Sequence, residues 1–375
     1  MTPAARLQAA IEILDEVIAA VRHDGPPADA IVTRYFKTRR YAGSSDRRAV
    51  RELVFRAIRR SGDAPASGRA AVIGLTQDQP ELSDLFGQSR GPETLQDGED
   101  AAPSSYLPGW IEAELSPSVS AAEWPALLQR APVDLRVNDA RARRSDILGH
   151  FLGAEATPLS PWGIRLPADS RIDDHPDFAS GLVEVQDEGS QLIALACQAQ
   201  AGQRVVDLCA GAGGKSLAIA GAAPGALILA TDSNRARLSQ LPPRAERAGA
   251  AVSTLLLNPP KELEQLAEWR DSADIVLVDA PCSGSGTWRR NPEGRWRLTS
   301  ERLDRLAATQ QRLLEIGSAG AARGAPSLCG LFIAEPGRGR PSRGFPQPTF
   351  ILAIAGSAGA WRTSRRAWSP AYTGP

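Results

Sequence analysis

The chain has 375 residues, with 43 Lys and Arg side chains against 43 Asp and Glu side chains, so its formal net charge is zero. A balanced charge excludes a uniformly basic nucleic-acid coat, but it is compatible with a local basic groove. Hydrophobic residues make up 42%, no apolar run reaches membrane-spanning length, and the four cysteines form no CxxC pair, so we expect a cytoplasmic globular protein without metal or disulfides.

Residues 1–88 are predicted to form a helical domain. Leu7, Ile11 and Ile18 recur at helical spacing, and Asp46 is placed to cap a second helix. Two interpretations of the arginines on that second helix remain open: a solvated helix face, or a surface that contacts the backbone of RNA. These arginines are Arg47, Arg48, Arg51, Arg56, Arg59 and Arg60.

Two further segments precede the strongest motifs. Residues 89–105 are rich in Gly, Pro, Ser and acidic residues, a composition that predicts a linker. Residues 106–180 mix the patterns of short strands and helices, and residues 134–138 alternate like a strand. They predict a small α/β subdomain in which spacing alone indicates no catalytic group.

Residues 181–318 are predicted to form an α/β domain with a parallel, doubly wound, Rossmann-like sheet, because apolar strands alternate with helical segments. The predicted strands are 205–208, 227–230, 254–257 and 275–278. The last three lead into Asp232, Asn258 and Asp279. Such sheets bind ligands at the carboxyl ends of their strands, so these three residues are candidate ligand-binding residues.

The first of these strands leads into a glycine-rich loop that opens a helix. The loop matches neither the Walker A pattern nor GxGxxG, but its glycines let the backbone pass close to a ligand at a helix N-terminus. Asp232, after the next strand, is placed to accept hydrogen bonds from both hydroxyls of a ribose. Together these features predict a nucleoside cofactor. The loop consists of Cys209, Ala210, Gly211, Ala212, Gly213, Gly214 and Lys215.

A cysteine directly after a proline, Cys282, follows the fourth predicted strand within residues 279–287. A buried structural cysteine is the simpler interpretation, but the Ser-Gly-Ser-Gly continuation favours a functional one. Arginines interleaved with tryptophans come next and predict a nucleic-acid groove, with surface arginines and core tryptophans as the alternative. These arginines are Arg289, Arg290, Arg295 and Arg297.

In these motifs the chain resembles the RsmB/Sun-type (NOL/NOP/Sun family) RNA cytosine-5 methyltransferases of the ribosomal small-subunit branch. The resemblance is carried by residues 209–216, Asp232, residues 279–287 and the Arg-Arg-Asn-Pro run that follows, and it extends to residues 130–138 and 185–192. It covers residues 1 to about 318. The family usually has Ala-Pro where this chain has Gly-Ala in the loop, and both pairs are small enough for the loop to form.

The resemblance implies a fold and a reaction. Residues 1–88 are similar to a NusB-like RNA-binding domain, and residues 106–180 to the RNA-binding segment of the family. The implied reaction is methylation of cytosine C5 in RNA, most directly in 16S ribosomal RNA, by a monomer with no metal or membrane partner. A thiolate adds to cytosine C6, which makes C5 nucleophilic, and a second thiol assists release.

The resemblance also implies roles for individual residues. Cys282 corresponds to the release cysteine, Asp279 contacts the cytosine edge and the cofactor side, and Lys215 contacts the base or the cofactor. The cofactor is S-adenosyl-L-methionine, with residues 209–215 at its amino-acid end, Asp232 at its ribose and Asn258 near its adenine.

The attacking cysteine of the family, in a Thr-Cys-Ser-like motif on the next strand, is missing here. After residue 317 the sequence is dominated by Gly, Ala, Pro, Ser and Arg, with Glu335 as its one acidic residue and no convincing alternation of strands and helices. Residues 319–375 are therefore interpreted as an out-of-frame, poorly ordered tail, with a natural basic tail as the alternative. Codons for residues 326–333 exist that, read one base later, encode Leu-Leu-Tyr-Val-Val-Cys-Ser. In this interpretation Cys329 is not the nucleophile.

Two function classes remain. The chain is an RNA cytosine-5 methyltransferase by family, or it is a non-catalytic RNA- or cofactor-binding protein because the nucleophile is absent. A DNA cytosine-5 methyltransferase also uses a Pro-Cys motif, but it lacks the helical domain and the segment at 130–138. We expect the chain as written to be inactive and poorly soluble, since residues 275–278 would become an apolar edge strand.

Overall fold

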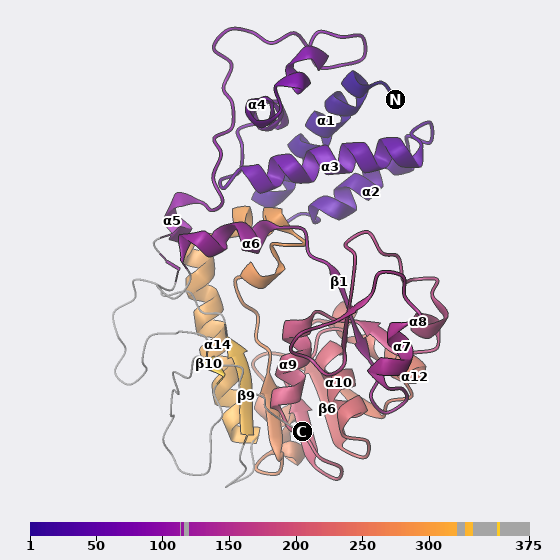
Figure 1. Ribbon diagram of the computed structural model, residues 1–375. Coiled ribbons are helices and arrows are strands. Elements are labelled where there is room, and N and C mark those ends of the chain that lie inside the picture. The colour runs from indigo at the N-terminus through magenta and orange to yellow at the C-terminus, as the bar shows by residue number, and fades with distance from the viewer. Residues whose placement is uncertain (113, 116–119, 321–326, 333–350, 353–375) are drawn as a thin grey trace. The chain divides into compact units, whose positions relative to one another are not determined.

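The computed structural model describes residues 1–112, 114–115, 120–320, 327–332 and 351–352 (Figure 1). The described residues form two compact units. We call residues 1–131 together with 283–304 the helical unit, and residues 132–282 together with the described residues from 305 onward the sheet unit. Among the described residues, none of the helices combines the length and the hydrophobicity that crossing a bilayer requires.

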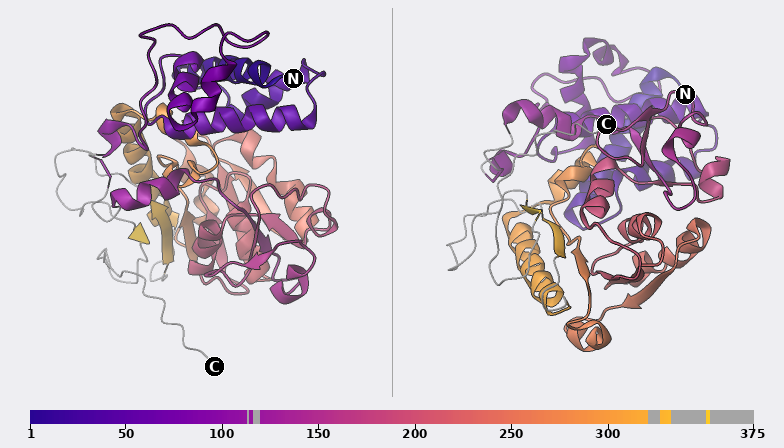
Figure 2. Two further views of the ribbon diagram at one scale, coloured as in Figure 1. Left: turned by 45° about the horizontal axis from the view of Figure 1, so that its top comes forward. Right: turned by 60° about the horizontal axis from the view of Figure 1, so that its bottom comes forward.

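The helical unit is built on four helices, in which α1 contacts each of the other three (Figures 1 and 2). They are α1 (Pro3–Arg22), α2 (Ala28–Lys37), α3 (Ser44–Arg60) and α4 (Gly68–Asp78). Leu7, Ile11 and Ile18 are buried in their shared core, as the helical spacing predicts. The shorter elements of this unit are η1 (Pro80–Leu85), α5 (Gly109–Glu112), η2 (Ala121–Glu123), α6 (Trp124–Leu128), η4 (Ser285–Thr287) and η5 (Pro292–Arg297).

The predicted linker, residues 89–105, contains no helix or strand but is hydrogen-bonded to the helices of its own unit. The N–H of Ala102 donates to the carbonyl of Ala70, and Arg60 of α3 donates to the carbonyl of Ala102. Arg69 of α4 forms an ion pair with Glu99 at 2.7 Å. The segment is therefore packed against its own unit and is not a flexible linker, because its backbone polar groups form hydrogen bonds with α3 and α4.

The sheet unit contains a six-stranded sheet in the order β10-β9-β8-β5-β6-β7. All neighbouring strands are parallel except β10, which runs antiparallel to β9. The strands are β5 (Arg204–Asp207), β6 (Leu227–Asp232), β7 (Val252–Leu256), β8 (Ile275–Val278), β9 (Ser327–Phe332) and β10 (Ile351–Leu352). This is the predicted Rossmann-like α/β fold.

Helices cover both faces of this sheet, because successive side chains of its strands point to opposite sides. Val205 packs with α9 and α10 on one face, whereas its neighbour Val206 packs with the C-terminal part of α14 on the other. The helices of the sheet unit are α9 (Glu188–Ala196), α10 (Gly214–Ala222), α11 (Arg235–Leu238), α12 (Leu241–Ala248), α13 (Glu262–Gln265) and η3 (Ala267–Trp269), with α14 (Ser300–Gly320) beginning in the helical unit and continuing here.

The end of the chain corrects two sequence-based expectations. A strand does follow residue 317, since β9 pairs in parallel with β8 and places Cys329 opposite Leu277. β8 is thus paired on both sides, by β5 and β9, and the prediction of an exposed apolar edge at residues 275–278 is wrong. The rest of the predicted out-of-frame tail, residues 321–326, 333–350 and 353–375, lies outside the described residues.

A second, antiparallel sheet in the order β2-β3-β1-β4 belongs to the sheet unit. Its elements are β1 (Val133–Val137), β2 (Glu155–Ala156), β3 (Gly163–Leu166) and β4 (Val183–Val185), with α7 (Arg144–Leu148) and α8 (Pro176–Ala179). Buried Glu184 of β4 accepts hydrogen bonds from Arg244 and Arg247 of α12, and buried Asn138 donates to the carbonyl of Ala248. These contacts attach the small sheet to the Rossmann-like domain.

The compact units therefore do not follow the predicted domain boundaries. The described residues between 106 and 131 pack with the helical unit, whereas residues 132–180 pack with the Rossmann-like sheet. Residues 283–304, predicted to continue the Rossmann-like domain, return to the helical unit.

Candidate active site

The glycine-rich loop connects the end of β5 to the start of α10, and its shape requires two of its glycines. Gly211 and Gly213 have φ values of +56° and +83°, in the left-handed region that glycine adopts without strain. A Cβ on Gly213 would lie 2.0 Å from a side-chain carbon of Leu241, and one on Gly211 would lie 2.4 Å from the guanidinium of Arg237. The two buried glycines thus let the loop pack closely against α11 and α12, and the half-buried Gly214 and Lys215 follow at the N-terminus of α10, where an anionic group binds readily.

Asp232 lies at the end of β6 and holds this loop. Its Oδ2 accepts the N–H of Gly211 at 2.8 Å, and its Oδ1 accepts the N–H of Asn234 at 2.7 Å. Each carboxylate oxygen has two lone pairs, so Asp232 retains capacity for ribose hydroxyls. Its predicted ribose contact and its observed support of the loop are therefore compatible.

Lys215 and Asp279 lie side by side, although they come from different elements. Nζ of Lys215, in the first turn of α10, lies 2.5 Å from Oδ2 of Asp279, which follows β8. The parallel strand order brings these two predicted site residues to the same sheet edge, because β8 pairs directly with β5. Asn258 is exposed after β7, and its N–H donates to the side chain of Gln265.

The two cysteines of the predicted site differ in environment. Burial, together with the nearby carboxylates of Asp207, Asp232 and Asp279, raises the pKa of Cys209 to about 12. Cys209 therefore stays a thiol at neutral pH and is unsuited to nucleophilic attack. Cys282 is half-buried, and the preceding peptide is held by a hydrogen bond from Gln310 to the carbonyl of Pro281.

Asp207 is a site residue that the sequence-based analysis of motifs missed. It ends β5, is 1% exposed, and accepts a hydrogen bond from the hydroxyl of Ser216 at 2.7 Å. Burial raises its pKa to about 6, partly offset by the hydrogen bond from Ser216 and the charge of Lys215. An acidic residue inside an apolar strand directly before a glycine loop was the available signal.

We expect Asp207→Asn to change how stability depends on pH. The folded-state pKa of about 6 lies above the ordinary 3.8, so the unfolded chain ionises first as pH rises, and stability is lost between about pH 4 and pH 6. A shift of two units corresponds to about 3 kcal/mol. The free energy of unfolding is measured with urea from pH 4.5 to 8. The difference between Asp207→Asn and the parent should therefore shift in favour of the variant as pH rises. Parallel pH curves for the two proteins would contradict this assignment.

The predicted RNA-contacting arginines are only partly accessible. Arg295 is completely buried in the helical unit, and its guanidinium donates to the carbonyls of Ile58 and Ser61, each at 2.7 Å. The prediction that Arg295 contacts RNA is therefore wrong, because none of its surface is available. Arg297 is half-buried and donates to the carbonyls of Gly25 and Pro26.

The neighbouring residues complete this correction. Trp288 and Trp296 are buried in cores of the helical unit, so they are not the base-stacking rings that the alternation with arginine predicts. Arg289 is half-buried and donates to the carbonyl of Gln129, and Arg290 is exposed. Of the four predicted arginines, Arg290 and Arg289 remain the candidates for RNA contact.

The arginines of α3 divide in the same way. Arg60 is buried and pairs with Asp78, and Arg59 donates to the carbonyl of Leu128 within the helical unit. Arg51 pairs with Asp29 across to α2. Arg48 is exposed on this helix. The helix therefore uses several arginines for packing within its own unit, and a continuous basic surface of six arginines is not formed.

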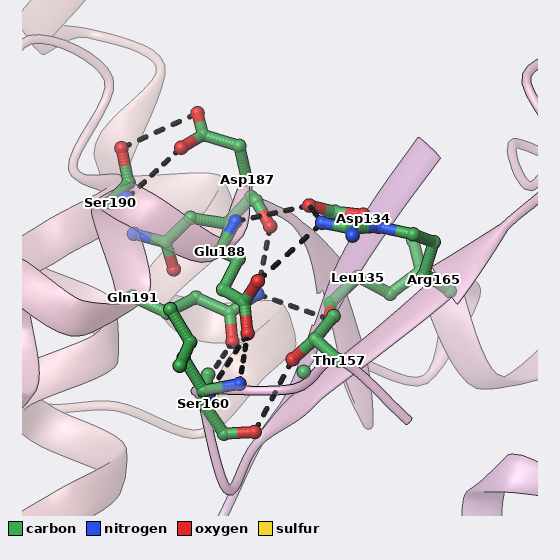
Figure 3. Close-up of polar contacts among 12 residues, drawn as sticks. Asp134, Leu135, Thr157, Ser160, Arg165, Asp187, Glu188, Ser190 and Gln191 are labelled. Atoms are coloured by element: carbon green, nitrogen blue, oxygen red, sulfur yellow. Dashed lines mark hydrogen bonds and ion pairs between the residues drawn. The ribbon is translucent and has the colours of Figure 1, made fainter. Parts of the chain in front are cut away.

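The start of α9 is hydrogen-bonded to the small sheet (Figure 3). Asp134 of β1 forms an ion pair with Arg165 and accepts the N–H of Glu188. Glu188 in turn accepts the N–H groups of Leu159 and Ser160. This network holds the first turn of α9 on the small sheet, and α9 in turn packs beside α10 (Figure 1).

The comparisons with known proteins match the part of the chain that carries the candidate site. Residues 193–324 match the family model described as 16S rRNA methyltransferase RsmB/F. This part of the chain is an RsmB/F-type methyltransferase domain. The chain is 32% identical over 237 residues to the ribosomal RNA small subunit methyltransferase B of Salmonella arizonae, and 31% identical over the same length to that of Salmonella typhi. Each alignment covers 60% of this chain, and the chain spans about half the length of these curated relatives.

A solved structure supports the fold of this chain. The crystal structure of PH0851 superimposes with a TM-score of 0.65 at 21% identity, covering 88% of this chain and 85% of that one. The likeness extends beyond the segment matched by the family model. At this identity the likeness shows the fold alone.

The RsmB/F-type domain is S-adenosylmethionine-dependent by family, and the described residues fit that cofactor. Glycine at positions 211 and 213, where a Cβ would clash with Arg237 or Leu241, lets the loop turn tightly into the N-terminus of α10. Asp232 lies beside this loop with free lone pairs for hydroxyl groups. Among the described residues, no group of three or more His, Cys, Asp or Glu side chains is placed to hold a metal ion.

Proposed function

We propose that this chain belongs to an enzyme that methylates C5 of cytosine in RNA, with 16S ribosomal RNA in the cytoplasm as its substrate. The observation that carries the proposal is the Lys215–Asp279 pair at 2.5 Å beside the glycine loop. It joins the cofactor loop to the Pro-Cys motif within one site. The name of the relatives, ribosomal RNA small subunit methyltransferase B, supports the choice of substrate.

The residues of the site have distinct proposed roles. S-adenosylmethionine supplies the methyl group. Residues 209–215 hold its amino-acid end, Asp232 accepts the ribose hydroxyls and Asn258 lies toward the adenine. Asp279, oriented by Lys215, hydrogen-bonds the cytosine edge, and Cys282 is the thiol that assists release of the product.

The attacking thiol must come from the carboxyl end of β9 for this chemistry. Cys329 pairs with Leu277 and so lies two residues, or about 7 Å, short of the level of Asp279. The shifted reading frame Leu-Leu-Tyr-Val-Val-Cys-Ser over residues 326–332 places a cysteine at position 331 instead. Since Gly330 pairs with Val278, position 331 is level with Asp279. We call the chain with these seven residues replaced the restored-strand variant.

This register also favours the alternative for the chain as written. A protein that keeps the cofactor loop but has its β9 cysteine in mid-strand fits a non-catalytic RNA- or cofactor-binding role. Both proposals predict cofactor binding, and only methyl transfer separates them.

The position of methylation is tested with RNA that carries tritium at cytosine C5. Attack at C5 displaces that hydrogen, so the restored-strand variant should release tritium into water in step with methyl incorporation. Methyl incorporation without tritium release would show that another atom is modified. The same RNA with tritium on adenine is the control.

We further propose that Arg289 and Arg290 contact RNA phosphates. Each phosphate contact on a single strand contributes about 0.7 to the slope of log binding constant against log salt concentration. The double variant Arg289→Ala, Arg290→Ala should therefore lower that slope by about 1.4. Arg270→Ala removes an exposed charge before β8, at the opposite end of the strand from the site, and should leave the slope unchanged. Equal slopes for the double variant and the parent would assign both arginines to a solvated surface.

A further inference from the structure

Gln186 has a buried hydrogen-bond donor without a protein partner. The residue follows β4, is 8% exposed, and its Nε2 meets no acceptor among the described residues. Its main chain is fixed, because its N–H donates to the carbonyl of Asp134 and its carbonyl accepts from the side chain of Gln191. A buried amide donor left unpaired costs stability, so an unpaired donor in a site indicates a missing ligand atom.

The orientation of this amide is determined by its neighbour. Nε of Arg136 donates to Oε1 of Gln186 at 2.6 Å, and an arginine side chain has donors only. The oxygen of Gln186 must therefore face Arg136, and Nε2 must point away from it. Arg136 is 2% exposed, and burial lowers its pKa to about 10, which leaves it charged at neutral pH.

Nε2 points toward the start of α10. A Cβ built on Gly214, the first residue of this helix, would lie 3.7 Å from Nε2 of Gln186. The first backbone N–H groups of a helix have no partner within it, and the helix dipole there favours negative charge. A buried side-chain donor and a helix N-terminus thus converge on the cofactor loop.

We propose that Gln186 donates a hydrogen bond to the carboxylate at the amino-acid end of S-adenosylmethionine, and of the S-adenosylhomocysteine that remains after methyl transfer. The inference rests on the proposed function of the loop. A carboxylate is the part of this ligand that meets a donor at a helix N-terminus, and the charge of Arg136 behind the amide strengthens its donor. The donor is needed because three carboxylates, Asp207, Asp232 and Asp279, surround the loop and repel an anion.

Two variants of Gln186 test the donor without removing the side chain. Gln186→Glu keeps an oxygen for Arg136 but replaces the donor with an acceptor, and Gln186→Met keeps the length but removes both polar atoms. Calorimetry with the full chain should show S-adenosylhomocysteine binding about 10- to 100-fold more weakly to either variant, as expected for loss of a hydrogen bond to a charged group. Binding of 5′-methylthioadenosine, which lacks the amino-acid end, should change less than about twofold.

Two controls separate the carboxylate from other effects. Decarboxylated S-adenosylmethionine keeps the amine and should bind Gln186→Met and the parent alike. Gln203→Met removes a half-buried amide just before β5, at the end of that strand away from the loop, and it should leave the binding of all three ligands unchanged. Circular dichroism melting curves establish that each variant is folded.

Every outcome decides the inference. Equal weakening of S-adenosylhomocysteine and methylthioadenosine by Gln186→Met would make Gln186 a support of the loop, and no weakening of either would remove it from the site. Both results overturn the proposal. If the parent chain binds none of the three ligands, the proposed cofactor site fails first, which is distinguishable because the failure appears before any substitution.

Discussion

Methyl transfer to ribosomal RNA should be at least about 10³-fold slower for the chain as written than for the restored-strand variant, because loss of a positioned nucleophile typically removes several orders of magnitude in rate. The restored cysteine is level with Asp279, whereas Cys329 pairs with Leu277. Cys209 cannot replace it, since burial and three carboxylates keep its thiol protonated. The measurement is incorporation of labelled methyl groups into 16S ribosomal RNA at saturating cofactor.

A matched pair isolates the thiol in this experiment. Within the seven replaced residues, Leu331→Cys and Leu331→Ser differ by one atom, so they should fold alike and bind S-adenosylhomocysteine alike. Only the cysteine form should be captured as a covalent complex by RNA that carries fluorine at cytosine C5, because C5 then has no proton to lose. Equal rates for the two forms would move the attack to another thiol, and Cys282→Ser in the same seven-residue background would test the remaining cysteine of the proposed site.

Arg295→Ala should destabilise the helical unit by about 3 kcal/mol or more. The substitution removes a completely buried guanidinium that donates to the carbonyls of Ile58, Ser61 and Pro292. These buried carbonyls then have lost the hydrogen-bond donor that Arg295 supplied. Burial lowers the pKa of Arg295 to about 9, so the group is still charged at neutral pH and its loss also alters the surroundings of buried Glu293. Urea unfolding followed by far-ultraviolet circular dichroism measures the effect.

Two control variants separate packing from RNA contact at this position. Arg289→Ala, in the same segment but half-buried, should change the free energy of unfolding by about 0.5 kcal/mol or less. Arg295→Lys keeps the charge but lacks the planar fork, so it should recover only part of the stability. A stable Arg295→Ala protein with weakened RNA binding would instead restore the original prediction of a nucleic-acid contact.

The structure removes the reason for the predicted poor solubility, but not the reason for the predicted inactivity. The paired position of β8 between β5 and β9 removes the exposed apolar edge that the sequence after residue 317 predicts. The physical reason is that a short apolar run, here residues 327–332, can add a strand to the sheet without carrying the attacking cysteine that the reaction requires. The expected inactivity of the written chain therefore rests on the missing thiol alone.

The sequence by itself determined the features whose signal is local. The spacing of Leu7, Ile11 and Ile18 predicted a buried helix face, and the loop with Gly211 and Gly213 predicted a ligand-binding turn, because period and backbone freedom depend on neighbouring residues. The acids after apolar strands likewise predicted the edge at which Asp232 and Asp279 lie, since a parallel sheet brings all its carboxyl ends together.

Only the tertiary structure decided which polar residues are buried. Arg295 and Arg290 are alike in sequence, five residues apart among glycines, prolines and tryptophans, yet one is enclosed by carbonyls of residues 58–61 and the other is exposed. Gln186 looked like any glutamine until Arg136 oriented its oxygen and left its nitrogen facing Gly214. Burial and hydrogen-bond satisfaction depend on segments far apart in the chain, and no local pattern of charge or hydropathy encodes those partners.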